Sequence, residues 1–481
     1  MNYKINGYNH IEAFHFFEDI SAVPRGSFKE EKISDFLVQF AKDRGLEYYR
    51  DDSLNVIIKK PASCGCTAEP VILQGHIDMV CEKLDGCGHD FETEGLDLIV
   101  DGDTLRANDT TLGADDGVAV ATMLYFLDND TLSLPPLECV FTTGEEVGLL
   151  GATAIDCSQL RGKKMINIDS EDENIVTVSC AGGMRIAFDK EVKTEAVCNA
   201  EALDIDIVGL KGGHSGMDID KNRINAIRLM ARILRFAQNS GWLISTKFCG
   251  GNADNAIPRE AHATIVASSE AKPLGGLLKY IETVEAETEV FEPEIRINST
   301  VQSGDYEVLT PADCSAILSA ITLAPNGVLY KMTEPEDFVV TSSSLGIAKV
   351  ENAKASIVFA PRSSVKTLQD ENLSVFEMLA ENLGFEISVS GRYPGWAWKE
   401  NSTIQELFKE CSKDVFGTVC KLEAIHAGLE CGLFSEAIPD LDVVSVGPTM
   451  TGVHTPEEKL SLSSFEKTIE LIEQVLKKLA K

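Results

Sequence analysis

Long apolar runs are missing from this sequence. The sequence contains no uncharged run of 18 apolar residues, whereas a helix that crosses a lipid bilayer needs about 20 consecutive apolar residues. The first segment, MNYKINGYNHIEAF, also lacks a basic stretch followed by an apolar one, which is the pattern of a secretory signal. We therefore expect a cytoplasmic protein without a membrane anchor.

Basic residues are few. The 43 Lys and Arg residues are outnumbered by 76 Asp and Glu residues, which gives a net charge of −33. Binding of DNA or RNA depends on basic surfaces that neutralise phosphates, so nucleic acid and anionic membranes are excluded as partners. Acidity of this size normally serves solubility, although we expect some of these carboxylates in a site.

A cysteine framework is also absent. The 13 cysteines are an odd number in a long chain, and the closest pair, Cys64-Gly-Cys66, has no second pair or histidine nearby to form a zinc knuckle. Reduced thiols in the cytosol are the interpretation that fits this usage.

The chain is long enough for several domains. Its 481 residues suggest roughly two to four. In residues 1–186, helix-like and strand-like segments alternate, which is typical of an α/β sheet whose site lies at the carboxyl ends of the strands. Apolar spacing predicts helices at 11–20, 28–45 and 117–127, and strands at 55–59, 71–75, 137–142 and 165–168.

The pattern changes in the middle of the chain. Residues 187–392 are predicted to form two related α+β halves of about 100 residues each, although we detect no sequence repeat. The predicted domains are 1–186 (first part of a catalytic domain), 187–392 (insert) and 393–481 (second part of the catalytic domain). Predicted elements after residue 187 are strands at 203–208, 262–268, 294–300, 338–342, 355–359, 385–390 and 443–446, and helices at 223–238, 274–288, 368–383, 464–480 and from 311.

Acidic and histidine residues follow several predicted strands. The run FTTGEEVGLLG, residues 141–151, places the adjacent carboxylates Glu145 and Glu146 after a strand, where neighbouring side chains point in different directions. His76 and His454 lie in predicted loops, and a single histidine in such a position is more often structural than functional. The case for a site comes from five residues that all lie where strands release their loops: His76, Asp115, Glu146, Asp169 and His454.

This residue set suits divalent metal ions. Imidazole and carboxylate ligands fit zinc, manganese or cobalt, and one carboxylate can bridge two ions. Two divalent ions bring four positive charges, which three ligand carboxylates and one bridging hydroxide balance. Glu145 then remains free to take a proton from the attacking water. Asp78, two residues from His76, can orient that imidazole.

Six motifs resemble a known family. They are H-x-D at 76–78, G-A-D-D at 113–116, G-E-E at 144–146, Asp169, G-G-H-S-G at 212–216 and the late His454. Together they resemble the co-catalytic zinc peptidases, the family of carboxypeptidase G, aminoacylase and the dipeptidases. The segments SAVPRGSFKEEK, GADDGVAVA and HAGLECGLF, with the long insert, are most similar to its aminoacyl-histidine dipeptidase branch, and the resemblance covers essentially the whole chain.

The resemblance implies a role for each metal-site residue. Asp115 would bridge two ions, His76 and Asp169 would complete one site, and Glu146 and His454 the other. Glu145 would be general base and then general acid, and Asp78 would support His76. The resemblance also implies a cis peptide bond between Asp115 and Asp116, and an α/β sheet sandwiched by helices with an inserted α+β lid.

The lid would supply substrate contacts. The resemblance implies that His214 polarises the scissile carbonyl, although a histidine between glycines can also be a turn residue. Asn255, Arg362 and Gly428 match positions that clamp substrate, and Arg362 could hold a C-terminal carboxylate. Arg362 could instead cap a strand, and His426 could be structural.

The expected reaction is hydrolysis of dipeptides with a free C-terminal carboxylate, Xaa-His among them. It would use two divalent metal ions per chain; Zn²⁺ is the expected metal, and Mn²⁺ and Co²⁺ are the alternatives. An N-acyl-amino-acid amidohydrolase of the same family and a non-catalytic metal- or peptide-binding relative remain alternatives. In family members with a short lid, a partner subunit supplies the carbonyl-polarising histidine. An insert of about 200 residues favours supply within one chain, and both monomer and homodimer stay open.

Overall fold

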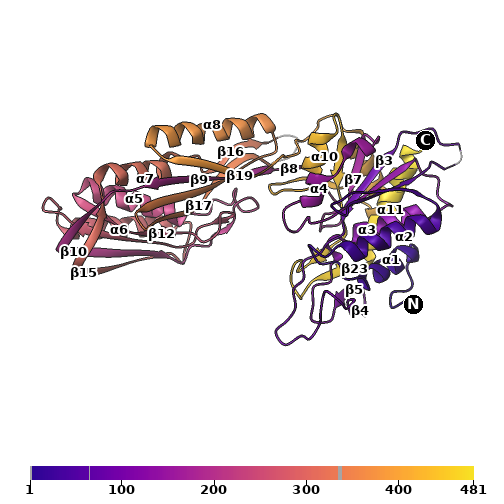
Figure 1. The fold of residues 1–481 in the computed structure, drawn as a ribbon, viewed down its shortest axis with the longest axis horizontal. Helices are drawn as coiled ribbons and strands as arrows, with labels where there is room; N and C mark the ends of the chain where they lie inside the picture. Colours follow the sequence, from indigo (N-terminus) through magenta and orange to yellow (C-terminus); the bar gives the residue numbers. More distant parts are fainter. Residues whose placement is uncertain (1–2, 64, 334–337) are drawn as a thin grey trace. The chain divides into compact units, whose positions relative to one another are not determined.

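The computed structural model describes residues 3–63, 65–333 and 338–481, so Cys64 of the C-G-C pair lies outside the described residues. The chain divides into two compact units (Figure 1). The first comprises Met1–Cys180, Trp396–Ala424 and Leu429–Lys481, and the second comprises Ala181–Gly395 and Ile425–Gly428. The second unit is therefore an insertion in the first, and the chain enters it twice.

The first unit contains an eight-stranded sheet. Its central strands β6, β3, β7 and β21 are parallel, and antiparallel strands flank them. The carboxyl ends of the parallel strands therefore meet at one edge. The strand order is β1 (Glu47–Arg50), β2 (Val56–Lys60), β6 (Leu137–Thr142), β3 (Val71–His76), β7 (Lys164–Asn167), β21 (Asp442–Ser445), β8 (Ile175–Cys180) and β20 (Lys421–Ile425).

Helices cover both faces of this sheet. Alternate strand residues such as Leu73, Phe141 and Ile166 share one core with the larger helices, because successive side chains of a strand point to opposite faces. These helices are α1 (Ile11–Ser21), α2 (Glu31–Arg44), α3 (Ala114–Asp128), α9 (Thr403–Phe416) and α11 (Leu462–Leu479). The intervening residues Ile72 and Val140 are also fully buried. They face the other side, where α10 (Cys431–Ala437) packs against β21 and α4 (Leu150–Ala154).

A smaller sheet links two distant segments of the first unit. Its order is β22 (Met450–Thr451), β23 (Lys459–Ser461), β5 (Thr104–Ala107) and β4 (Leu98–Asp101). Leu460 on β23 pairs with Leu105 on β5. This pairing holds the 452–458 loop beside the segment that leads into α3.

The second unit is built on a nine-stranded sheet. In its first half β10 pairs with β15 and β14, and β14 pairs with β12; in its second half β18 pairs with β17 and β9, and β9 pairs with β19. Pairing of β12 with β17 joins the halves, and one core spans both. The strands are β9 (Gly182–Glu191), β10 (Thr194–Val208), β12 (Trp242–Gly250), β14 (Ala261–Ala267), β15 (Arg296–Leu309), β16 (Gly327–Met332), β17 (Phe338–Glu351), β18 (Lys354–Ser363) and β19 (Glu386–Tyr393).

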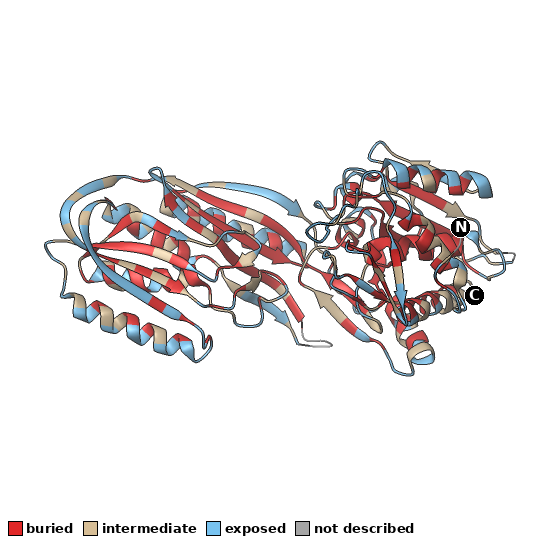
Figure 2. Ribbon diagram, turned by 90° about the horizontal axis from the view of Figure 1, so that it is seen from below, coloured by how far each residue is buried: buried red, intermediate tan, exposed pale blue. Residues whose placement is uncertain are grey.

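Four helices pack in this core: α5 (Ala226–Asn239), α6 (Leu274–Glu289), α7 (Pro311–Leu323) and α8 (Lys366–Leu383). Buried residues follow the strands of each unit (Figure 2). A separate ribbon, β11 (Gly213–His214) with β13 (Ala256–Ile257), pairs His214 with Ala256. Among the described helices, none is long and apolar enough to cross a membrane. The predicted α/β sheet with an inserted α+β domain is confirmed.

Candidate metal centre

Five potential ligands come together at the carboxyl edge of the main sheet. His76 ends β3, Glu146 follows β6, and Asp169 follows β7, three neighbouring parallel strands. Asp115 lies at the start of α3, and His454 lies in the loop between β22 and β23. The small sheet pairs the segments that carry these last two residues.

Asp115 occupies the centre of the group. Its Oδ1 lies 2.9 Å from Nε2 of His76, and its Oδ2 lies 3.0 Å from Nε2 of His454. On the His76 side, Oδ1 of Asp169 is 3.8 Å from the same Nε2. On the His454 side, the two oxygens of Glu146 are 3.1 and 3.0 Å from Nε2. The arrangement is thus two imidazole-carboxylate pairs that share one carboxylate.

The electrostatics of this group favour a cation. Burial and the nearby Asp116 raise the pKa of Asp169 well above its usual range, and burial raises the pKa of Glu145 to about 8. Hydrogen bonds that the imidazole of His454 donates to Asp115 and Glu146 raise the pKa of His454 to about 10. Acidic side chains are therefore crowded around both imidazoles. Divalent ions relieve such crowding, and a set of imidazole and carboxylate donors fits zinc, manganese or cobalt.

Possible ligand atoms also include groups that the sequence did not suggest. Among the described residues, three sets of donors lie within 4.8 Å of one another: His76, Asp116 and Asp169; His76, Glu145 and Glu146; Asp115, Glu146 and His454. Asp116 is fully buried, and its oxygens accept hydrogen bonds from the backbone N–H groups of His76 (3.2 Å) and Ala119 (3.3 Å). We therefore assign it to the support of the loop. The peptide bond between Asp115 and Asp116 is cis, as the resemblance implied.

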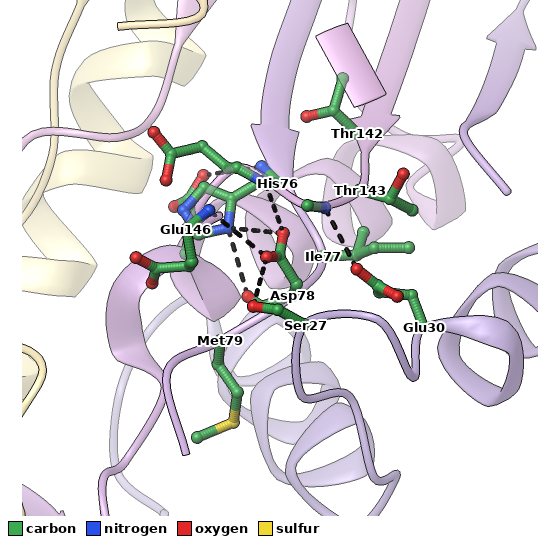
Figure 3. A network of polar contacts seen from close by, with 12 residues as sticks. Ser27, Glu30, His76, Ile77, Asp78, Met79, Thr142, Thr143 and Glu146 are labelled. Atoms are coloured by element: carbon green, nitrogen blue, oxygen red, sulfur yellow. Dashed lines mark hydrogen bonds and ion pairs between the residues drawn. The ribbon is translucent and has the colours of Figure 1, made fainter. Parts of the chain in front are cut away.

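Asp78 connects one ligand to the Glu145-Glu146 turn (Figure 3). Its Oδ1 lies 3.4 Å from Nδ1 of His76 and accepts the N–H of Glu145 at 3.1 Å. Its Oδ2 accepts from Ser27 Oγ at 2.8 Å and from the N–H of Glu146 at 3.4 Å. Burial opposes ionisation, but hydrogen bonds from His76 and Ser27 lower the pKa of Asp78. This geometry suits a carboxylate that orients His76 and holds the turn.

A second polar group lies within the inserted unit and includes His214. Its Nδ1 accepts the backbone N–H groups of Gly216 (3.2 Å) and Met217 (3.0 Å). Because Nδ1 is an acceptor, the proton of the neutral ring is on Nε2. Burial, followed by the charge of Arg362, lowers the pKa of His214. The side chain is thus a neutral donor through Nε2.

Arg362 is a buried cation without an acidic partner among the described residues. Only 8% of its surface is exposed, and its Nε has no hydrogen-bond partner there. Nη1 donates to Tyr393 Oη at 3.1 Å, and Nη2 donates to Ser215 Oγ at 3.4 Å. The residue lines a cavity of about 250 Å³ together with Asn255 and Tyr393. Asp254 also lines the cavity, but its Oδ2 lies 3.1 Å from Nε of Arg185. A buried charge normally has a partner, so the cavity beside Arg362 suits an anion.

His426 and Gly428 lie beside this cavity group. Nε2 of His426 is 2.7 Å from Ser342 Oγ, and its Nδ1 has no partner among the described residues. Burial and Arg362 lower the pKa of His426 to about 4, so the ring is neutral. A Cβ on Gly428 would lie 2.8 Å from the Tyr393 ring, so packing alone accounts for this glycine.

Comparison with known proteins identifies the family. The model of the peptidase family M20/M25/M40 matches residues 72–478. The chain belongs to this family. It is 33% identical over 467 residues to the cytosol non-specific dipeptidase of Escherichia coli (strain K12), with 96% of each chain covered.

Solved structures agree with this M20/M25/M40 membership. The crystal structure of aminoacylhistidine dipeptidase from Vibrio alginolyticus has a TM-score of 0.93 and 34% identity, and the match covers 99% of this chain and 98% of that one. The aminopeptidase PepT from Bacillus cereus, at a TM-score of 0.56 and 17% identity, shares the fold alone.

Three buried charged residues of this M20/M25/M40 chain support the centre and were not predicted. Glu458 accepts the N–H groups of residues 112, 113 and 114 at 2.7, 3.0 and 2.7 Å, immediately before Asp115. Arg25 donates to the carbonyls of residues 77 and 78 at 3.2 and 3.1 Å. Glu30 accepts the N–H of Gly144 at 3.1 Å. Each contact joins segments far apart in the chain, so no local spacing could have revealed it.

The predicted site residues therefore form two groups. The structure brings His76, Asp78, Asp115, Glu145, Glu146, Asp169 and His454 together in the first unit, and His214, Asn255, Arg362 and Gly428 in the second. Their roles in metal binding and catalysis stay predictions.

Proposed function

We propose that this chain is a metallo-dipeptidase that cleaves dipeptides with a free C-terminal carboxylate, Xaa-His among them. The observation that carries the proposal is Asp115, which presents one oxygen to each of two imidazoles that have further carboxylates beside them. Two relatives that match nearly the whole chain at 33% and 34% identity are named as dipeptidases. We place the reaction in the cytoplasm, as the name of the E. coli relative states for that protein.

Two divalent ions would be held by five side chains. His76 and Asp169 would hold one ion, Glu146 and His454 the other, and Asp115 both. Zn²⁺ is our first choice, with Mn²⁺ and Co²⁺ as alternatives. When bound, such ions make a water more acidic and polarise a carbonyl group.

Glu145 would move the proton. Its backbone N–H is held by Asp78 at 3.1 Å, which fixes the turn from which the side chain extends. The Glu145 carboxylate takes a proton from the attacking water and gives it to the nitrogen of the departing amine. The adjacent Glu146 keeps its role as a ligand, because its oxygens lie 3.1 and 3.0 Å from Nε2 of His454.

The inserted unit would bind the C-terminal residue of the substrate. Arg362 would offer a carboxylate its Nε, which has no partner among the described residues, and the neighbouring Nη. His214 would offer Nε2–H to the carbonyl of the scissile bond. Ser215, the residue after His214, accepts a hydrogen bond from Arg362 Nη2 at 3.4 Å, which supports a shared role for His214 and Arg362 in binding one substrate. In a dipeptide the scissile bond lies immediately before the C-terminal residue, so Arg362 would hold the carboxylate of that residue and His214 the carbonyl of the residue before it.

A substrate panel tests the proposal. The purified protein, supplied with Zn²⁺, Mn²⁺ or Co²⁺, should hydrolyse β-Ala-His and other dipeptides faster than tripeptides. The N-acyl-amino-acid amidohydrolase remains the second candidate, because a cavity for a carboxylate also accepts an acetylated amino acid. Turnover limited to acetylated amino acids would support that candidate and contradict ours. Metal binding without turnover of any substrate would indicate a non-catalytic relative.

A further inference from the structure

Glu430 is a buried acid that the proposed reaction does not use. It lies immediately before α10, and its side chain is fully buried. Its Oε2 accepts the hydroxyl of Thr142 at 2.6 Å and an N–H of the Gln74 side chain. Its Oε1 has no partner among the described residues. Burial raises the pKa of Glu430 to about 7.

The partners of Glu430 form a polar layer directly behind the proposed ligands. Gln74 precedes His76 by two residues on β3, and Thr142 pairs with His76 in the register of β3 and β6. On β7, Asn167 precedes Asp169 by two residues and donates to Oε1 of Gln74 at 2.8 Å. Gln74 also donates to Thr142 Oγ1 at 3.1 Å. The network thus connects the ends of all three strands that lead to ligands.

A role in stability alone does not explain this layer. Two positions further back, on the same face of the sheet, these strands carry Ile72, Val140 and Met165, which are fully buried and apolar. Burial of a carboxyl group and two amides is costly unless each atom is hydrogen-bonded, and Asn167 Oδ1, like Glu430 Oε1, has no partner among the described residues. An apolar layer would have packed the sheet at lower cost. This hydrogen-bonded layer lies where the three strands end at the proposed ligands.

We infer that Glu430 is a positioning residue for the metal ligands. It acts through Gln74 and Thr142, and holds the ends of β3 and β6 so that His76 and the Glu145-Glu146 turn keep their separation. The inference rests on the proposed di-metal function and assigns a role in it to a residue that touches neither ion nor substrate. Supporting groups of this kind typically change metal affinity or activity 10- to 100-fold when removed.

The test compares two substitutions of Glu430 with a matched control. Glu430→Met removes the hydrogen bonds at similar volume, whereas Glu430→Gln keeps an acceptor for Thr142 and Gln74. The control is Glu138, a buried acid on the other end of β6 whose oxygens accept backbone N–H groups of residues 161 and 162 at 2.9 to 3.1 Å. For each protein, Zn²⁺ affinity is measured by competition with a chelating dye, together with kcat, KM and the melting temperature of the metal-free form.

Glu430→Met should bind Zn²⁺ 10- to 100-fold more weakly than the wild type, and Glu430→Gln should stay within about threefold of it. Glu138→Met should lower the melting temperature and leave Zn²⁺ affinity unchanged. If Glu430→Met does not fold, Thr142→Val, which removes only the hydroxyl donor, should still weaken Zn²⁺ binding several-fold. Equal Zn²⁺ affinity in the wild type and in the folded variant would overturn this inference alone. A wild-type chain that binds no divalent ion would overturn the proposed function and this inference with it.

Discussion

Arg362 offers a sharp test of substrate recognition, because it is a buried cation that donates to the neutral groups Tyr393 Oη and Ser215 Oγ. In Arg362→Met a substrate carboxylate would lose two charge-assisted hydrogen bonds of roughly 1.5 to 3 kcal/mol each. In the free protein the guanidinium already donates hydrogen bonds to Tyr393 and Ser215, which offsets part of this energy. We therefore expect transition-state binding to weaken by about 3 to 4 kcal/mol. That corresponds to a roughly 10²- to 10³-fold fall in kcat/KM.

The assay compares β-Ala-His with β-Ala-His amide, which has no C-terminal carboxylate. The wild type should prefer the free acid strongly, whereas Arg362→Met should hydrolyse both substrates at similarly low kcat/KM. Arg228→Met is the control: this arginine of the same unit donates to the carbonyls of residues 321 and 324 at 3.1 and 3.2 Å, so its loss should change stability and not the preference. If Arg362→Met weakens turnover of acid and amide by the same factor, Arg362 does not bind the carboxylate.

Three further outcomes follow from the structure. Glu145→Gln should lower kcat by about 10²- to 10⁴-fold while metal analysis still finds two ions per chain; full turnover would remove Glu145 from the role of base. Removal of metal by a chelator should abolish turnover and lower the melting temperature by several degrees, because the ions bind only the folded chain; an unchanged melting curve would contradict the centre. Burial opposes ionisation of Glu473, but hydrogen bonds from His10 and Lys477 lower its pKa from 4.5 to about 2. The ionised carboxylate therefore stabilises the fold fully above a pH of about 4.5, and this stabilisation is lost as the pH falls toward 2. Glu473→Gln should therefore lower the free energy of unfolding by about 1 to 2 kcal/mol at pH 7, after allowance for solvent screening, and by less at pH 3; a difference that does not shrink at low pH would contradict this assignment.

The sequence predicted the strands and helices that carry strong apolar patterns. Strands at 71–75, 137–142 and 165–168 correspond to β3, β6 and β7, and the helix at 464–480 corresponds to α11. Because these strands are buried on both faces, each contains an apolar run (71–73, 139–141 and 165–166), and the polar residues that follow these runs mark the edge of the sheet. The same rule located His76, Glu146 and Asp169 before any contact was known.

Elements with weaker patterns were missed or shortened. The predicted strand at 203–208 is the end of β10, which begins at Thr194 and pairs with β15 over residues that are largely exposed. Exposure removes the apolar alternation on which the prediction depends. The predicted helix at 223–238 begins at Ala226, because the Asn225 side chain accepts the N–H groups of residues 227 and 228 and caps the helix.

Long-range contacts could not be read from the sequence. Glu430 lies 356 residues from Gln74 and 288 from Thr142, and Glu458 lies 344 residues from Ala114. The short return of the chain into the second unit at Ile425–Gly428 also has no local signature. These features depend on which segments the folded chain brings together, and a single sequence does not encode that in any spacing.

The most direct test of the central claim is a metal titration of the metal-free protein, with hydrolysis of β-Ala-His as the readout. If Asp115 joins two metal sites, activity should rise with added Zn²⁺, Mn²⁺ or Co²⁺ and saturate at two ions per chain. Full activity in the metal-free protein, or bound ions without any hydrolysis of dipeptides, would contradict the account.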